Sequence, residues 1–166
     1  MLAIGLLILG IISRLITHVP NFTPVIALSL FSGVYLRKGQ AVIFPLVLLA
    51  ITDLILGFHV TMAFTYLSVF LISLIGFWLK DHKNIKNVTI TSLYSSILFF
   101  VITNFGVWLV SGLYPLTAAG FKDCFVLAIP FFKTELFSTI LYTVVFFGAY
   151  ELIASRVKNT RFAHVL

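Results

Sequence analysis

Residues 88–110 read VTITSLYSSILFFVITNFGVWLV, a stretch without a charged side chain. An α-helix rises about 1.5 Å per residue, so about 20 mainly apolar residues cross the hydrocarbon core of a bilayer. This stretch is long enough to do so. It therefore predicts a transmembrane helix, and that helix decides the fold class of the chain.

The composition of the whole chain agrees with a membrane protein. Hydrophobic residues make up 61% of its 166 residues and charged residues 10%, whereas soluble domains average about 45–50% and about 25%. Such a chain cannot cover its surface with polar groups, so lipid must form part of its solvent. We expect one transmembrane domain over residues 1–166. Its apolar start, with no basic region or cleavage site, predicts a retained helix and not a signal peptide.

Six apolar segments are expected to form transmembrane helices, which makes the predicted fold an all-α integral membrane bundle. They cover residues 1–16, 24–36, 41–58, 60–79, 88–110 and 131–155. The second is short for a hydrocarbon core of about 30 Å, so it must be tilted, shielded by protein or extended through its ends. Thr23 can cap this helix, and Pro24 suits its first position.

Residues 111–130 are expected to form a long outer loop between the fifth and sixth helices. Pro115, Gly120 and Pro130 punctuate this segment, and proline disfavours a continuing helix. A short helix at the membrane interface is expected over residues 121–129. Long ordered loops are uncommon unless they serve a function.

The basic residues predict the orientation. With six spans, eight Lys and Arg residues fall on one side of the membrane and three on the other. The eight are Arg37, Lys38, Lys80, Lys83, Lys86, Arg156, Lys158 and Arg161, and the three are Arg14, Lys122 and Lys133. Because positive residues favour the cytoplasmic side, both termini are expected in the cytoplasm. The same pattern accounts for the net charge of +6 without a nucleic-acid partner.

Four polar side chains are expected at similar depth in the outer third of the membrane. Asp53 lies five residues before the end of its segment, or about 8 Å inside it, and Asn104, Glu135 and Arg14 occupy matching positions in theirs. Membrane charges usually face the bundle interior or a wet cavity. We therefore expect an outward-facing cavity with these four on its floor. Its mouth would be formed by His18, Asn21, His59, Trp108, Tyr114 and Cys124.

A structural explanation of the same layer is open. Arg14 can pair with Asp53 or Glu135, Asn104 can stabilise a kink, and Trp108 can anchor at the interface. In that case the layer would be fully paired and would enclose no cavity.

Metal binding and catalysis are not expected. His18, His59 and Cys124 could ligate a soft metal, but their spacing matches no metal motif, so we predict no metal and no cofactor. Cys124 has no evident base beside it, and the chain lacks a phosphate-binding glycine loop. The sequence therefore predicts a protein that is not an enzyme.

Three short stretches resemble a family of transport proteins. Residues 21–28 read NFTPVIAL, residues 31–33 read FSG, and residues 52–57 read TDLILG. They are similar to the early helices of the S-components, the substrate-binding subunits of energy-coupling-factor vitamin transporters. The resemblance implies a six-helix bundle with both termini inside and an outward-facing pocket for a small, vitamin-like molecule.

The resemblance also implies a partner, an energy-coupling membrane subunit with its ATPases. S-components dock that subunit through an Ala-x-x-x-Ala signature in their first helix. Here Ala3 is followed four residues later by Leu7, so the signature is missing. The sequence therefore lacks the motif that would dock the energy-coupling subunit. A solitary transporter or receptor is the other arrangement.

A second resemblance covers nearly the whole chain. SRL at 13–15, NFTP at 21–24, TNFGVW at 103–108 and AIPFF at 128–132 are similar to an uncharacterised bacterial membrane protein family of similar size. It brings little assigned function.

The sequence thus favours a multi-pass protein of the bacterial inner membrane that captures or transports a small, vitamin-like molecule. One alternative is a non-transport membrane protein, such as an assembly factor or a subunit of a larger membrane complex. A membrane-embedded enzyme is a further alternative, although no convergent acid, base or metal group supports it.

Overall fold

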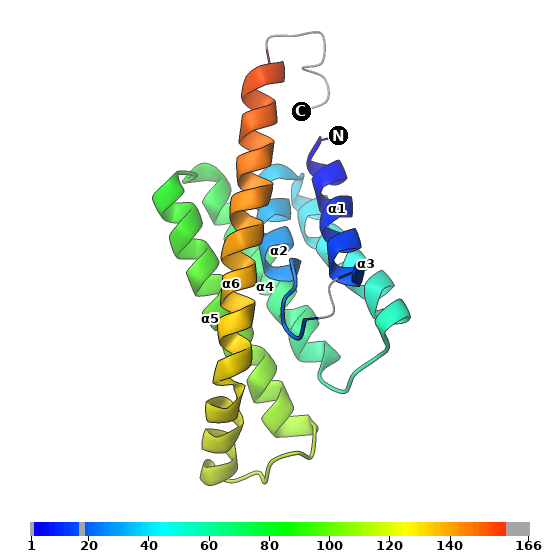
Figure 1. Cartoon of the computed structure of the whole chain (residues 1–166), viewed down its shortest axis with the longest axis vertical. Coiled ribbons are helices and arrows are strands. Elements are labelled where there is room, and N and C mark those ends of the chain that lie inside the picture. Colours follow the sequence, from blue (N-terminus) through cyan, green and yellow to red (C-terminus); the bar gives the residue numbers. More distant parts are fainter. Residues whose placement is uncertain (1, 17–18, 159–166) are drawn as a thin grey trace.

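The computed structural model describes residues 2–16 and 19–158, which form α-helices and connections without a strand (Figure 1). The helices are α1 (Leu2–Ile16), α2 (Val25–Tyr35), α3 (Lys38–Leu56), α4 (Met62–Asp81), α5 (Ile85–Val110) and α6 (Ala118–Val157). By length and composition, α3, α4, α5 and α6 can cross a membrane, whereas α1 and α2 are apolar but shorter. The described chain is therefore all-α and of the multi-pass membrane type.

Helix α2 lies at the centre of the bundle and contacts each of the other five helices. Ten of its 11 residues are buried. Phe31 is fully buried and packs its ring against Tyr35, Phe146 and Phe147. Protein therefore shields this short helix, which was one of the three possibilities that its length left open.

The start of α2 differs slightly from the expectation. The helix begins at Val25, and no side chain caps its first turn. Thr23 uses its backbone instead: its N–H donates to Ser138 Oγ over 3.4 Å, and its carbonyl accepts from the same hydroxyl over 3.2 Å. The connection before α2 is thus held against α6.

Helices α2 and α4 touch through their backbones at Gly33 and Gly76. A Cβ atom added at Gly33 would lie 2.5 Å from the carbonyl oxygen of Ser73 and 2.6 Å from the Cα of Gly76. A Cβ atom at Gly76 would lie 2.7 Å from the carbonyl oxygen of Leu30. Small residues allow such close packing where lipid provides no hydrophobic force between helices.

The expected long outer loop is wrong. Helix α6 begins at Ala118, and Thr117 Oγ1 caps its first turn. It continues past Pro130 and ends at Val157, for a total length of 40 residues. The connection from α5 therefore covers residues 111–117 only. Proline removes one backbone donor but need not end a helix when neighbouring groups compensate. The residues from Ala118 to Pro130 are accordingly part of the helix. At 1.5 Å per residue α6 is about 60 Å long.

The helix ends divide into two sets (Figure 1). The start of α1, the end of α6, and the α2–α3 and α4–α5 connections lie at the upper end in that view, whereas the α3–α4 and α5–α6 connections lie toward the lower end. Seven of the eight basic residues expected on the cytoplasmic side are described. They lie in the segments at the upper end, and they are Arg37, Lys38, Lys80, Lys83, Lys86, Arg156 and Lys158. The fold therefore keeps most of the positive charge at one end of the bundle.

Candidate functional site

An ion pair joins α1 to α3. Arg14 Nη2 lies 2.7 Å from Asp53 Oδ1, and Arg14 Nη1 donates to Thr52 Oγ1. Tyr66 of α4 donates its hydroxyl to Asp53 Oδ2 over 3.1 Å. The side chains of Arg14 and Asp53 are 16% and 2% exposed, so this is a nearly buried and well-bonded pair. The pairing of Arg14 with Asp53 that the sequence allowed is present.

An open cavity of about 650 Å³ lies beside this ion pair. All six helices contribute to its lining, together with the α1–α2, α3–α4 and α5–α6 connections. Its volume falls in the range of about 300–1,000 Å³ that is typical of small-molecule sites. Seven of the ten predicted site residues line it: Arg14, Asn21, His59, Asn104, Tyr114, Cys124 and Glu135.

The other three predicted site residues lie elsewhere. Asp53 stands behind Arg14 and does not line the cavity. Trp108 also lies outside the lining and bonds to the α5–α6 connection. His18 is outside the described residues.

Glu135 is the acidic residue among the described residues that line the cavity. Its side chain extends from α6, and the residue is 4% exposed. Oε1 accepts a hydrogen bond from Thr139 Oγ1 over 3.1 Å. Within the described part of the chain, Oε2 makes no hydrogen bond of ordinary length, although the Ser96 hydroxyl of α5 lies close to this carboxyl group. A buried carboxylate oxygen left without a partner is costly, which marks it as a group that a ligand could satisfy.

A second unpaired oxygen lies in the same lining. Thr23 Oγ1 is buried and makes no hydrogen bond to any described residue. Its neighbour Asn21 has a positive φ of 59°, a conformation that asparagine tolerates better than most residues. This tight turn directs the connection back toward α6.

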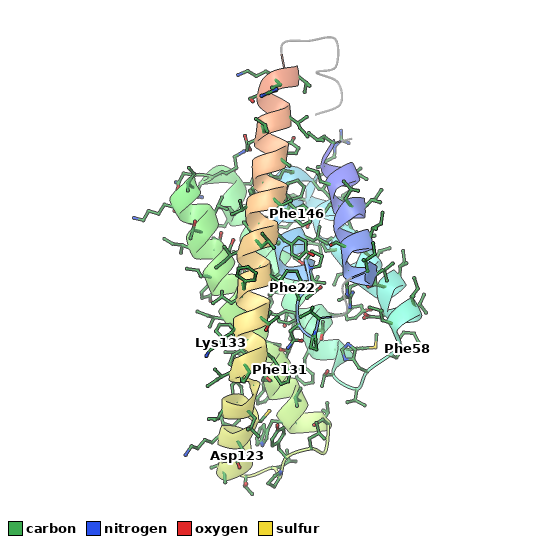
Figure 2. The ribbon with its side chains drawn as sticks, viewed as in Figure 1. Phe22, Phe58, Asp123, Phe131, Lys133 and Phe146 are labelled. Atoms are coloured by element: carbon green, nitrogen blue, oxygen red, sulfur yellow. The ribbon has the colours of Figure 1, made fainter. Side chains whose placement is uncertain are left out.

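Aromatic rings form much of the remaining wall. They come from the α1–α2 connection, α5 and α6, and they are Phe22, Phe99, Phe100, Phe131 and Phe132. In Figure 2 Phe22 and Phe131 lie on one side of α6, whereas Lys133 lies on the other. Lys133 is exposed, so this cation points away from the cavity.

Local hydrogen bonds hold the polar groups of α5 and of the α3–α4 connection. Asn104 Nδ2 donates to the carbonyl oxygen of Phe100 over 2.8 Å, and Cys124 Sγ donates to that of Asn104 over 3.4 Å. His59 Nδ1 lies 2.9 Å from Thr61 Oγ1. Among the residues that the structure describes, no three His, Cys, Asp or Glu side chains converge as a metal site would require.

The carbonyl of Pro115 fastens the α5–α6 connection to both helices. It accepts a hydrogen bond from Trp108 Nε1 over 3.1 Å and another from Thr117 N over 2.8 Å. A Cβ atom on Gly120 would lie 2.1 Å from this oxygen. Leu113 and Tyr114 of the same connection line the cavity, so Gly120 indirectly controls the cavity wall.

We expect Gly120→Val to displace the Pro115 carbonyl and break its bond with Trp108. Overpacking of this kind costs about 1–3 kcal/mol. The chain has two tryptophans, so the emission of Trp108 can be followed in a Trp78→Phe background. Its emission maximum should shift to the red, while Gly148→Val, at a position with nothing within 4 Å, should leave it unchanged. An unshifted maximum in Gly120→Val would contradict the contact.

A second cavity, of about 410 Å³, lies between α5 and α6 and is mainly apolar. At one end Lys83 Nζ pairs with Glu151 Oε1, and Tyr35 donates its hydroxyl to the same carboxylate oxygen. This cluster joins the end of α2, the α4–α5 connection and α6. Because its charges are paired and its walls apolar, this cavity resembles a groove for lipid chains more than a polar ligand site.

Sequence reasoning missed several residues of the candidate site. Phe99 and Phe100 were not singled out, and Thr23 was expected only as a helix cap. Phe22, Thr103, Phe131 and Phe132 were quoted only within the stretches that resemble other families. Hydroxyl groups in apolar helices commonly bond to their own backbone, so the sequence alone carries no signal that Thr23 lacks a partner. Rings spread over three separate segments likewise show no common spacing.

Comparison with known proteins gives a family but no assigned activity. No curated protein and no solved structure matches the chain significantly. Residues 1–161 match DUF6580, described as a family of unknown function. This match covers nearly the whole chain and includes every residue of the cavity lining. The chain therefore belongs to the DUF6580 family.

Proposed function

We propose that the protein is a membrane transport or substrate-binding protein that captures a small, vitamin-like molecule in its polar cavity. The observation that carries the proposal is the cavity of about 650 Å³ with two buried and unpaired oxygens, Glu135 Oε2 and Thr23 Oγ1, in its lining. Buried polar atoms are normally bonded. Two exceptions in one open cavity favour a site whose polar groups bond to a ligand.

The alternative of an assembly factor or complex subunit fits less well. That function predicts a fully paired polar layer and no cavity. Arg14 is indeed paired with Asp53, but Glu135 belongs to neither of the ion pairs found among the described residues. The open cavity beside them has no purpose in that alternative.

The charge distribution supports the proposed orientation. With the basic end of the bundle in the cytoplasm, the cavity opens on the outer side of a bacterial inner membrane. The arrangement is then like that of an S-component, with six membrane-embedded helices and both termini inside. Because Leu7 replaces the second alanine of the docking signature, a solitary transporter or receptor is the simpler proposal.

A test is to identify small molecules that co-purify with the protein in detergent by mass spectrometry. Ala128 lines the cavity from α6, so Ala128→Trp should fill it and reduce the co-purified ligand at least about tenfold. Ala63→Trp places the same side chain at an exposed position of α4 outside the lining and should retain the ligand. Equal retention by both folded variants would contradict binding in this cavity.

A further inference from the structure

The charges of the candidate cavity do not balance. Among the described residues that line it, Arg14 is the one Arg or Lys residue and Glu135 is the one Asp or Glu residue. Asp53 neutralises Arg14 at 2.7 Å, so the pair contributes no net charge. Among the described residues no cation lies within 4.0 Å of the Glu135 carboxylate, because the ion pairs there are Arg14–Asp53 and Lys83–Glu151. The charged form of Glu135, at a site 4% exposed, thus has no cation among the described residues to stabilise it.

The hydrogen bonds of Glu135 show which part of it is available. Oε1 is engaged by Thr139 Oγ1 from the next turn of α6. Oε2 accepts no hydrogen bond within the described residues. A carboxylate can accept about four hydrogen bonds, so Oε2 has room for a donor from a molecule in the cavity beside the nearby Ser96 hydroxyl.

The walls around this carboxylate suit a cation with an apolar body. Five phenylalanine rings line the same cavity, from Phe22 to Phe132. The face of an aromatic ring attracts a cation within about 6 Å of its centre. An anionic ligand would instead place a second negative charge beside a charged Glu135, whereas a cation would stabilise the charged carboxylate in a region of low dielectric constant.

We propose that Glu135 binds a positively charged nitrogen of the ligand, so that the cavity selects small organic cations with an aromatic or apolar body. This inference rests on the proposed function and adds the substrate class to it. The cation lies against Oε2, and its body fills the space between the rings of α5 and α6. The Arg14–Asp53 pair borders the site as a neutral wall.

Three matched compounds test the proposal: 2-naphthylmethylamine, 2-naphthylmethanol and 2-naphthoate, which share one ring system and carry a positive, a neutral and a negative head at neutral pH. Binding to the purified protein in detergent is measured by isothermal titration calorimetry. The amine should bind at least about tenfold more tightly than the alcohol, and the naphthoate should bind most weakly. Glu135→Gln keeps the size of the side chain and should weaken binding of the amine by about 30-fold or more, since it removes one partner of a buried charged pair.

Glu151→Gln is the matched control, because it makes the same change on α6 at the paired and more exposed glutamate. It should leave binding of the amine unchanged. Glu135→Asp retains the charge and should bind the amine more tightly than Glu135→Gln does. If the alcohol or the naphthoate binds as tightly as the amine and Ala128→Trp abolishes that binding, the cavity is a binding site but the substrate class is wrong. If none of the three binds to the folded protein, the inference and the proposed function both fail.

Discussion

Gly76→Leu is expected to destabilise the fold strongly. Gly76 and Gly33 bring the backbones of α4 and α2 together, and even a Cβ atom at Gly76 would lie 2.7 Å from the carbonyl oxygen of Leu30 and 2.8 Å from the Cα of Gly33. The obstacle is backbone, which cannot rotate away as a side chain would. We expect a loss of at least about 3 kcal/mol, or a fall of roughly 6–12 °C in Tm in detergent.

The matched control for this substitution is Gly5→Leu. Gly5 is an exposed residue of α1 with nothing within 4 Å of an added Cβ atom. Its variant should unfold at nearly the temperature of the native protein, as followed by circular dichroism. Equal unfolding temperatures for Gly76→Leu and Gly5→Leu would show that α2 and α4 do not meet at these glycines.

Arg14→Leu should be the next most damaging change. It leaves Asp53, which is 2% exposed, without its cation, and breaking one side of a buried ion pair costs about 3–5 kcal/mol. The double variant Arg14→Leu with Asp53→Leu removes both charges and should recover most of that loss. Thermal unfolding of the two single variants and the double variant gives the coupling free energy.

The outcome also separates structure from ligand binding. Arg14 lines the cavity and Asp53 does not. Because the pair carries no net charge, the double variant should still bind any ligand of the protein within about tenfold of the native affinity. Additive effects of the two single changes would contradict the pair. A complete loss of ligand by a stably folded double variant would place this pair in the binding site itself.

The sequence could predict that Arg14, Asn104 and Glu135 come together, but it could not choose between Asp53 and Glu135 as the partner of Arg14. Counting 1.5 Å per residue placed Arg14, Asp53, Asn104 and Glu135 at one level, and three of these line one cavity while Arg14 and Asp53 also pair. Depth is only one coordinate of a helical residue. The other is the direction around the helix axis, and helices that are apolar on every side reveal little of it.

Helix starts show the same limit. Asn84 caps α5 by accepting from Asn87 N over 2.8 Å, which extends that helix by three residues before the apolar segment that begins at Val88. Thr117 does the same for α6, and the expected break at Pro130 does not occur. Apolar length identifies the membrane segment well, whereas the polar turns that precede it belong to the helix through capping chemistry.

Cys124 is the one cysteine of the chain, and it lies buried in the lining of the candidate cavity. The native protein therefore carries a built-in reporter that needs no engineered residue. The rate at which a membrane-impermeant maleimide modifies this thiol measures how often the cavity wall opens, and addition from either side of sealed vesicles tells which way the mouth faces. A ligand that slows the modification would reveal its own occupancy, so unknown substrates could be screened by the protection of a single sulfur atom.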